Sequence, residues 1–136
     1  MKKLFFTLTF LFLTVFVFSQ QTYYKVYQSE IYVKNKILDS WILEKKHEDV
    51  NIDIIIENDV ITIHAQSPTM FRLDKSTKEK LETTNLIGFR YDSKELKNNN
   101  YCTVDIMKLK SGEFYIISII YVNDGYNLRY FINNEK

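Results

Sequence analysis

The sequence of 136 residues has only one cysteine, one proline and three glycines. The single cysteine, Cys102, excludes an intrachain disulfide and a metal site built from paired cysteines. So little proline and glycine excludes a flexible linker or a low-complexity segment. The chain also lacks a glycine-rich phosphate loop and a nucleophile-elbow sequence, so we expect no bound cofactor and no enzymatic activity.

Neither sign of charge is in large excess: the chain has 18 Lys and Arg against 17 Asp and Glu. This balance gives no support for a nucleic-acid partner or an anionic membrane surface. Hydrophobic residues make up 46% of the chain and aromatic residues 15%. A chain of this length and composition is large enough for one core, which predicts a single domain.

The first residues have the layout of a secretory signal peptide. Lys2 and Lys3 precede an apolar, threonine-containing run over residues 4–18. We therefore expect a signal peptide at residues 1–19 and a mature β domain at residues 20–136, located in the periplasm or outside the cell. An uncleaved anchor is the alternative, but the run is shorter than the roughly 20 apolar residues that a membrane-spanning helix needs.

The C-terminal third predicts a three-stranded antiparallel meander. Ser-Gly at 111–112 and Asp-Gly at 124–125 are typical of two-residue hairpin turns between β-prone runs. These turns place Val104 opposite Ile119, and Ile119 opposite Tyr130. Side chains alternate across a strand, so the registers place one set on a single inward face. That set is Cys102, Val104, Ile106, Ile117, Ile119, Tyr121, Leu128, Tyr130 and Ile132.

The reverse face of this meander is mixed. Asp105 and Arg129 lie on it, close enough across the middle strand to attract each other. Its main apolar side chains are Phe114, Ile116, Ile120 and Phe131. A solvent-facing surface would be more polar, so we expect partial cover from a helix, a second sheet layer or a partner chain.

Upstream segments also have strand character. Residues 22–34 predict a strand whose imperfect alternation indicates a bulge. A second strand begins at Trp41 and is expected to end in a solvated, charged turn at residues 44–49. Residues 69–74 predict a further short strand after the Ser-Pro break.

A second hairpin is predicted around Asn-Asp at residues 58–59. Its register places Ile54 opposite Ile63 on one face. On the other face Asp53 lies opposite His64.

The best helix candidate of the mature chain is residues 76–83, because the sequence at 76–79 fits a capping box. A strand is expected at residues 85–91, with Gly88 marking a bulge or a close approach of backbones. Residues 93–100 are polar and predict a loop or a helical turn.

About eight short strands and one short helix predict a mainly β fold, either a small antiparallel barrel or a rolled sandwich. The pattern at 102–104 (Cys-Thr-Val), with a Ser-Gly turn and an Asn-Asp-Gly turn between Tyr121 and Tyr126, resembles small exported β-rich proteins of Gram-negative bacteria that have no assigned activity. The architecture is also similar to lipocalin-like barrels, although the Gly-x-Trp signature of lipocalins is missing near the first strand. The resemblance implies an exported barrel and assigns no catalytic residue.

Two polar clusters are candidates for chemistry, the Asp53 and His64 pair and residues 47–49. A carboxylate such as Asp53 can orient a facing imidazole such as His64 and raise its pKa. A catalyst also needs a nucleophile or an activated water, and the alternative is an exposed cross-strand pair worth under about 1 kcal/mol. The sequence at 47–49 (His-Glu-Asp) could supply metal ligands, but two histidines without zinc-motif spacing are equally explained by a charged turn.

Aromatic residues give the more informative pattern. Tyrosine combines an apolar ring with a polar tip, which suits pocket mouths and protein interfaces, although aromatic residues also fill β cores. We expect a non-enzymatic binder of a small apolar ligand, held in a barrel-like pocket near Trp41, Tyr121 and Tyr130. The alternative is a protein-interaction module, such as an inhibitor, immunity or envelope-assembly factor, that uses the mixed face of the meander.

Overall fold

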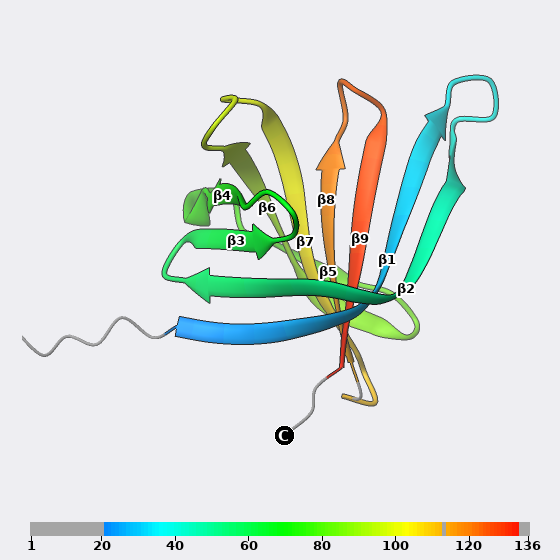
Figure 1. Ribbon diagram of the computed structural model, residues 1–136. Helices are drawn as coiled ribbons and strands as arrows, with labels where there is room; N and C mark the ends of the chain where they lie inside the picture. Colours follow the sequence, from blue (N-terminus) through cyan, green and yellow to red (C-terminus); the bar gives the residue numbers. More distant parts are fainter. Residues whose placement is uncertain (1–20, 113, 134–136) are drawn as a thin grey trace, which may run out of the picture.

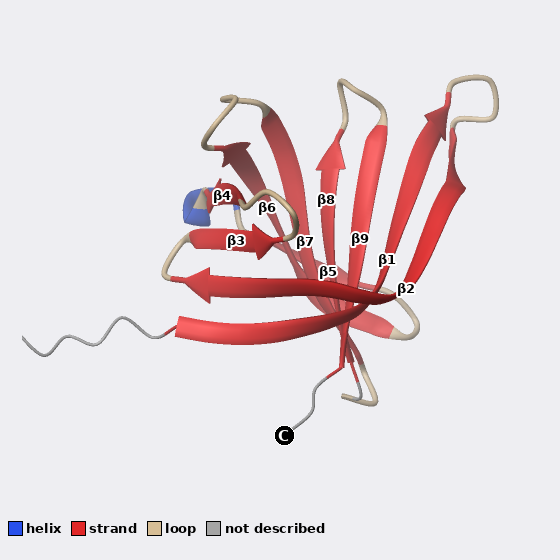
Figure 2. Cartoon of the chain, viewed as in Figure 1, coloured by secondary structure: helices blue, strands red, loops and turns tan. Residues whose placement is uncertain are grey.

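The computed structural model describes residues 21–112 and 114–133. The expected signal peptide at residues 1–19 lies outside the described residues. The described part forms nine antiparallel strands and one 3-10 turn (Figure 1, Figure 2). They are β1 (Gln21–Asn35), β2 (Ser40–Glu57), β3 (Val60–His64), β4 (Thr69–Leu73), η1 (Lys75–Thr77), β5 (Glu79–Glu82), β6 (Leu86–Glu95), β7 (Tyr101–Leu109), β8 (Phe114–Tyr121) and β9 (Tyr126–Asn133).

Eight of these strands close into an antiparallel barrel, which confirms the predicted fold class. The order across the sheet is β4-β3-β2-β1-β9-β8-β7-β6, and β4 pairs with β6 to complete the ring. Phe71 lies opposite Glu95 in this closing pair, and Leu73 lies opposite Ser93. β5 pairs with the other half of the same β6 edge. Together, β4 and β5 therefore pair with the backbone hydrogen-bonding groups along this edge of β6.

The two longest strands, β1 and β2, bend at a corner that lets them contribute to two walls of the barrel (Figure 1). The register slips between Val26 and Gln28 against both β2 and β9, so the bulge expected in β1 is confirmed. On β2, Asp49 has a positive φ of 53° at the same corner. The turn expected at residues 44–49 is wrong: these residues belong to β2, and residues 45–48 are paired with β1. Only their exposure agrees with the prediction.

The meander has one register as predicted and one that differs. Val104 lies opposite Ile119, as expected from the β7–β8 turn. Ile119 lies opposite Leu128 rather than Tyr130, because the β8–β9 connection uses four residues, 122–125, instead of two. A shift of two residues preserves the face of every side chain, and all nine predicted inward residues belong to the core or pack against it.

The barrel interior is filled by apolar side chains. Those that are almost completely buried are Phe71, Ile54, Ile61, Ile117, Ile119, Ile132, Val26 and Val104. Burying each of these contributes roughly 1.5–3 kcal/mol relative to exposure. The predicted β2–β3 hairpin supplies part of this core, with Ile54 opposite Ile63 and Asp53 opposite His64 as expected.

The expected helix at residues 76–83 is largely wrong. A single 3-10 turn, η1, ends at Thr77, and Glu79–Glu82 forms β5 instead. The cap is Asp74, whose carboxylate accepts a hydrogen bond from the Ser76 backbone amide at 2.9 Å. Pairing with the free half of the β6 edge outweighs the weak local preference of this short polar segment for a helix.

The reverse face of the meander carries a polar row across six strands. Each residue lies opposite the next in the order Arg90, Asp105, Ser118, Arg129, Glu30 and Lys46. The expected attraction between Asp105 and Arg129 is replaced by other contacts: the Arg90 guanidinium donates two hydrogen bonds to Asp105, at 2.7 and 2.8 Å, and Arg129 stacks 4.3 Å from the Tyr32 ring centroid. Within the described part of the chain, the single sheet leaves this face without a second layer.

Gly88 is a site of close backbone approach, not a bulge, because its pairing with Met107 continues the β6–β7 register without a shift. A Cβ added there would overlap the carbonyl oxygen of Ile106 and lie 2.7 Å from the Cα of Met107. Only glycine fits at this position without moving one strand from the other.

The substitution Gly88→Ala should therefore lower the free energy of unfolding by about 3 kcal/mol, measured by urea denaturation. Gly112→Ala is the matched control, since Gly112 has a positive φ of 81° but no neighbour within 4 Å of an added Cβ. Its cost should be about 1 kcal/mol, from the backbone conformation alone. Equal losses for the two variants would contradict the close approach at Gly88.

Candidate binding site at the mouth of the barrel

Three connections meet at one end of the barrel, which we call the mouth. They are the β1–β2, β6–β7 and β8–β9 turns, seen together at the top of Figure 1. The Lys34 backbone amide donates a 2.9 Å hydrogen bond to the carbonyl oxygen of Gly125, which ties the first of these turns to the last. Tyr121 and Tyr126 lie opposite each other where β8 and β9 enter their turn.

A hollow of about 450 Å³ lies at the mouth. Its lining residues are Glu95, Asn100, Tyr121, Asp124, Tyr126 and Leu128. The volume is within the range of pockets that hold small molecules. Two phenol rings and a leucine provide apolar walls, and two carboxylates and an amide provide polar groups.

Glu95 lines this hollow and is largely buried, with 7% of it exposed. The Tyr121 hydroxyl donates a 3.0 Å hydrogen bond to one carboxylate oxygen, and the Asn98 amide donates a 2.8 Å bond to the other. Burial, with the charge of Glu95 and this hydrogen bond, raises the pKa of Tyr121 far above its ordinary value. The Tyr121 hydroxyl therefore stays protonated at physiological pH and acts as a hydrogen-bond donor. The centroid of the Tyr121 ring lies 6.4 Å from the centroid of the Phe71 ring.

The three tyrosine and tryptophan residues expected at a ligand site occupy different places. Tyr121 lines the mouth hollow. Tyr130 packs against the core below it, where burial raises its pKa to about 12. Trp41 lies opposite Lys34 in the β1–β2 hairpin, with the Lys34 ammonium 5.6 Å from the indole centroid. Neither Tyr130 nor Trp41 lines the mouth hollow.

Glu95 and Asn98 are not among the residues expected at a site, because residues 93–100 predict a loop or a helical turn. β6 in fact continues through Glu95. The alternation of Tyr91, Ser93 and Glu95 along an extended strand is the pattern that would have placed this carboxylate on the inner face.

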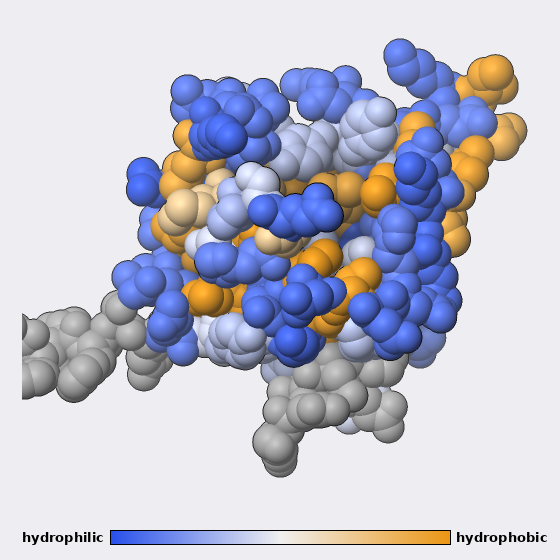
Figure 3. Space-filling model, in the orientation of Figure 1, coloured by the Kyte–Doolittle hydropathy of each residue, from blue (hydrophilic) through white to orange (hydrophobic). Residues whose placement is uncertain are grey.

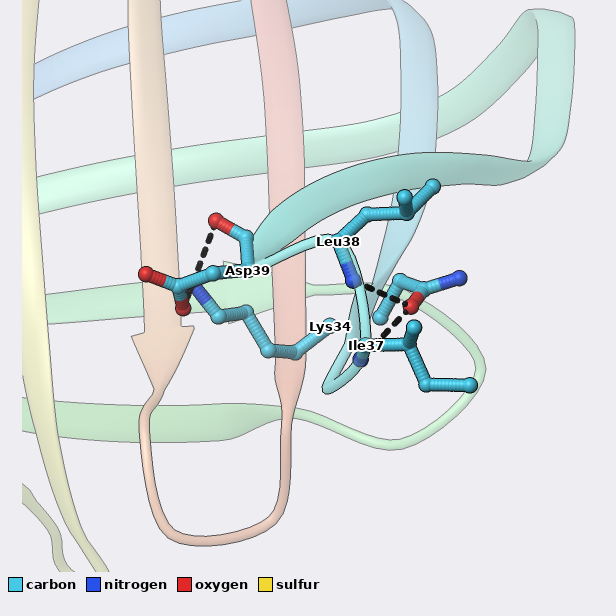
Figure 4. Close-up of polar contacts among 5 residues, drawn as sticks. Lys34, Ile37, Leu38 and Asp39 are labelled. Atoms are coloured by element: carbon cyan, nitrogen blue, oxygen red, sulfur yellow. Dashed lines mark hydrogen bonds and ion pairs between the residues drawn. The ribbon is translucent and has the colours of Figure 1, made fainter.

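Exposed apolar side chains surround the mouth. Ile37 is 93% exposed and Leu38 is 68% exposed at the tip of the β1–β2 hairpin (Figure 4), and Figure 3 shows the apolar surface of this tip at its upper right. The Asn35 side-chain oxygen accepts hydrogen bonds from the backbone amides of both residues, at 2.9 and 3.0 Å. An ion pair of 2.7 Å between Lys34 and Asp39 closes the turn (Figure 4).

The other turns at this end add exposed side chains of the same kind, which are Tyr101, Val122 and Tyr126. Large apolar side chains that protrude at a rim are typical of surfaces that meet an apolar ligand or a partner. The mouth thus combines a hollow with an apolar border.

A second, larger hollow of about 940 Å³ is lined by β4, η1, β6 and the start of β7, and it extends to the β6–β7 and β8–β9 turns, where the rim residues Tyr101 and Val122 line it. Its charged residues balance: Arg72, Lys75 and Lys94 against Asp59, Asp74 and Asp92. Several of these already have partners, since Asp74 caps η1 and the Lys94 ammonium lies 5.4 Å from the Tyr101 ring centroid. This hollow has no charge preference and shares no residue with the mouth hollow.

The groups weighed for chemistry do not assemble a reactive centre. Asp53 faces His64, but its carboxylate lies 3.6 Å from the Lys25 ammonium, and His64 is exposed. The described residues contain no cluster of three or more potential metal-ligating His, Cys, Asp or Glu side chains. Cys102 is buried, as expected of a small apolar side chain, and burial raises the pKa of its thiol to about 11.

The raised pKa of Tyr130 predicts a loss of stability in alkaline solution. The folded state holds the phenol proton more tightly than the unfolded state, whose pKa is near 10.0. The stabilisation is therefore complete below pH 10 and is lost as the pH rises towards 12. Between pH 9 and 11.5 the free energy of unfolding should fall by about 2 kcal/mol more in the wild type than in Tyr130→Phe, measured by urea denaturation. Parallel pH profiles of the two proteins would contradict the burial of this phenol.

The described part of the chain contains no helix long and apolar enough to cross a membrane. No protein-family model, no curated protein and no solved structure matches the sequence or the fold of this chain.

Proposed function

We propose that this chain is an exported, non-enzymatic binding protein that holds a small, largely apolar ligand at the mouth of its barrel. The observation that carries the proposal is the hollow of about 450 Å³ walled by Tyr121, Tyr126 and Leu128. Concave sites with apolar walls and a few convergent polar groups are typical of small-molecule binding.

The packed interior determines where the ligand sits. Phe71, Ile54 and Ile117 are at most 1% exposed, so side chains occupy the volume that a deep barrel cavity would need. The ligand therefore contacts the barrel above this core. Its apolar part lies against the two tyrosine rings, and its polar part lies near Glu95.

Removal of the expected signal peptide would release the barrel into the periplasm or the surroundings of the cell. In this proposal the mature chain does not span the membrane and has no nucleic-acid partner. The apolar residues of the rim, such as Ile37 and Val122, extend the surface that a ligand meets as it arrives.

A protein-interaction module remains the second candidate, favoured by one feature of the reverse face. Met107, Ile116 and Phe131 form a half-buried apolar row beside the charged row, and the Tyr27 ring lies 6.4 Å from the Phe131 ring. A partner chain could cover these two rows together, with apolar contacts from one row and ion pairs from the other.

Binding of a neutral fluorescent probe, N-phenyl-1-naphthylamine, tests the mouth site. The substitution Tyr126→Ser removes a half-exposed wall residue and should weaken the affinity at least tenfold, because the lost aromatic contact is worth about 1.5 kcal/mol. Tyr23→Ser, at an exposed tyrosine outside the hollow, is the matched control and should change the affinity less than twofold.

Mass spectrometry of the natively purified full chain gives an independent readout. A co-purified small molecule that is lost in Tyr126→Ser supports the proposal. Unchanged probe affinity in Tyr126→Ser, together with a stoichiometric protein partner that is lost in Phe131→Ser, would favour the interaction module instead.

A further inference from the structure

We propose that the ligand at the mouth carries a positively charged ammonium group that pairs with Glu95. This inference rests on the proposed binding function and specifies the chemical class of its ligand, a small amine with an apolar body. It starts from a difference between Glu95 and the other buried carboxylates.

Three acidic side chains of the described residues are buried, with exposed fractions between 6% and 9%: Glu30, Glu95 and Asp105. A buried carboxylate is costly unless it is paired with a positive charge or well hydrogen-bonded. Asp105 is paired with the Arg90 guanidinium. Glu30 also accepts its hydrogen bonds from neutral groups, the Gln28 amide at 2.8 Å and the Tyr32 hydroxyl at 2.6 Å, but it lies in the polar row opposite two cations, Arg129 and Lys46.

Among the described residues, Glu95 has neutral hydrogen-bond partners and, unlike Glu30, no cation opposite it on the neighbouring strand. It lies opposite Phe71, and its hydrogen bonds come from the Tyr121 phenol and the Asn98 amide. The ion pairs formed within the described part of the chain do not include Glu95. The neighbouring Lys94 does not compensate it, because that ammonium is over the ring of Tyr101.

The carboxylate of Glu95 can also accept further hydrogen bonds. Each of its oxygens accepts one hydrogen bond, and a carboxylate oxygen can accept two. An ammonium group supplies both of the missing elements, since it carries a positive charge and three N–H donors. Glu95 is one of the residues that line the hollow, and a small part of it is exposed there.

The remaining walls favour the same ligand charge. Asp124 adds a second carboxylate at the turn, and none of the described residues that line the hollow is a lysine, arginine or histidine. The faces of Tyr121 and Tyr126 attract cations through their ring quadrupoles, while Leu128 accommodates an apolar chain. An anionic ligand of the same size would meet two like charges and no counter-charge.

Isothermal titration calorimetry with three probes of equal chain length tests this inference on the full chain. The probes are n-hexylammonium, 1-hexanol and hexanoate. We expect the ammonium to bind at least tenfold more tightly than the alcohol, and hexanoate to bind more weakly than either. Glu95→Gln, which keeps an acceptor for the Tyr121 hydroxyl, should remove the preference for the ammonium and leave the affinity for the alcohol within twofold.

Glu79→Gln, an exposed carboxylate on β5, is the matched control and should keep the full preference. Equal affinities of the wild type for ammonium and alcohol, with binding still weakened by Tyr126→Ser, would overturn the charge inference and leave the binding function standing. Absence of binding by all three probes and by the neutral dye would overturn both. The wild-type comparison decides the question even if Glu95→Gln does not fold.

Discussion

The closing contact between β4 and β6 is the constraint on which the rest of the structure depends. It converts an open, twisted sheet into a ring, and it leaves β5 to cover what remains of the β6 edge. The same contact sets Phe71 opposite Glu95. Because Phe71 points into the packed core, the register that closes the barrel also places a carboxylate inside its end. Fold and site thus share one set of backbone hydrogen bonds.

Local turn chemistry was sufficient to predict much of this fold. The Asn-Asp and Ser-Gly turns fixed the β2–β3 and β7–β8 registers, since each connects two strands of strong β propensity. The β8–β9 register shifted by two residues because Val122 and Asn123 joined the turn, yet Tyr130 kept its inward direction. Because side chains alternate between the faces of a strand with a period of two residues, the face of a side chain is more predictable than the residue opposite it on the next strand.

The failures occurred where distant pairing overrides local preference. Residues 44–49 are highly charged, but the hairpin with β1 keeps them in the strand, with residues 45–48 paired between two register shifts. Residues 76–83 are expected to form a helix because of the capping box at 76–79, but residues 79–82 pair with the unpaired half of the β6 edge as β5. For the same reason, the sequence predicts only part of the candidate site. The inward direction of Tyr121 follows from the meander alone. The inward direction of Glu95 instead depends on the extension of β6 to pair with β4.

The packed interior beneath the mouth has a consequence for ligand exchange. A molecule enclosed in a deep barrel can leave only when strands or loops separate, so its residence time reflects fluctuations of the protein. Here Phe71 and the buried isoleucines close the space below, and Tyr126 at the entrance is itself half exposed to water. In the proposed function, the ligand would therefore arrive and leave without any opening of the barrel wall, and would exchange rapidly with the surroundings.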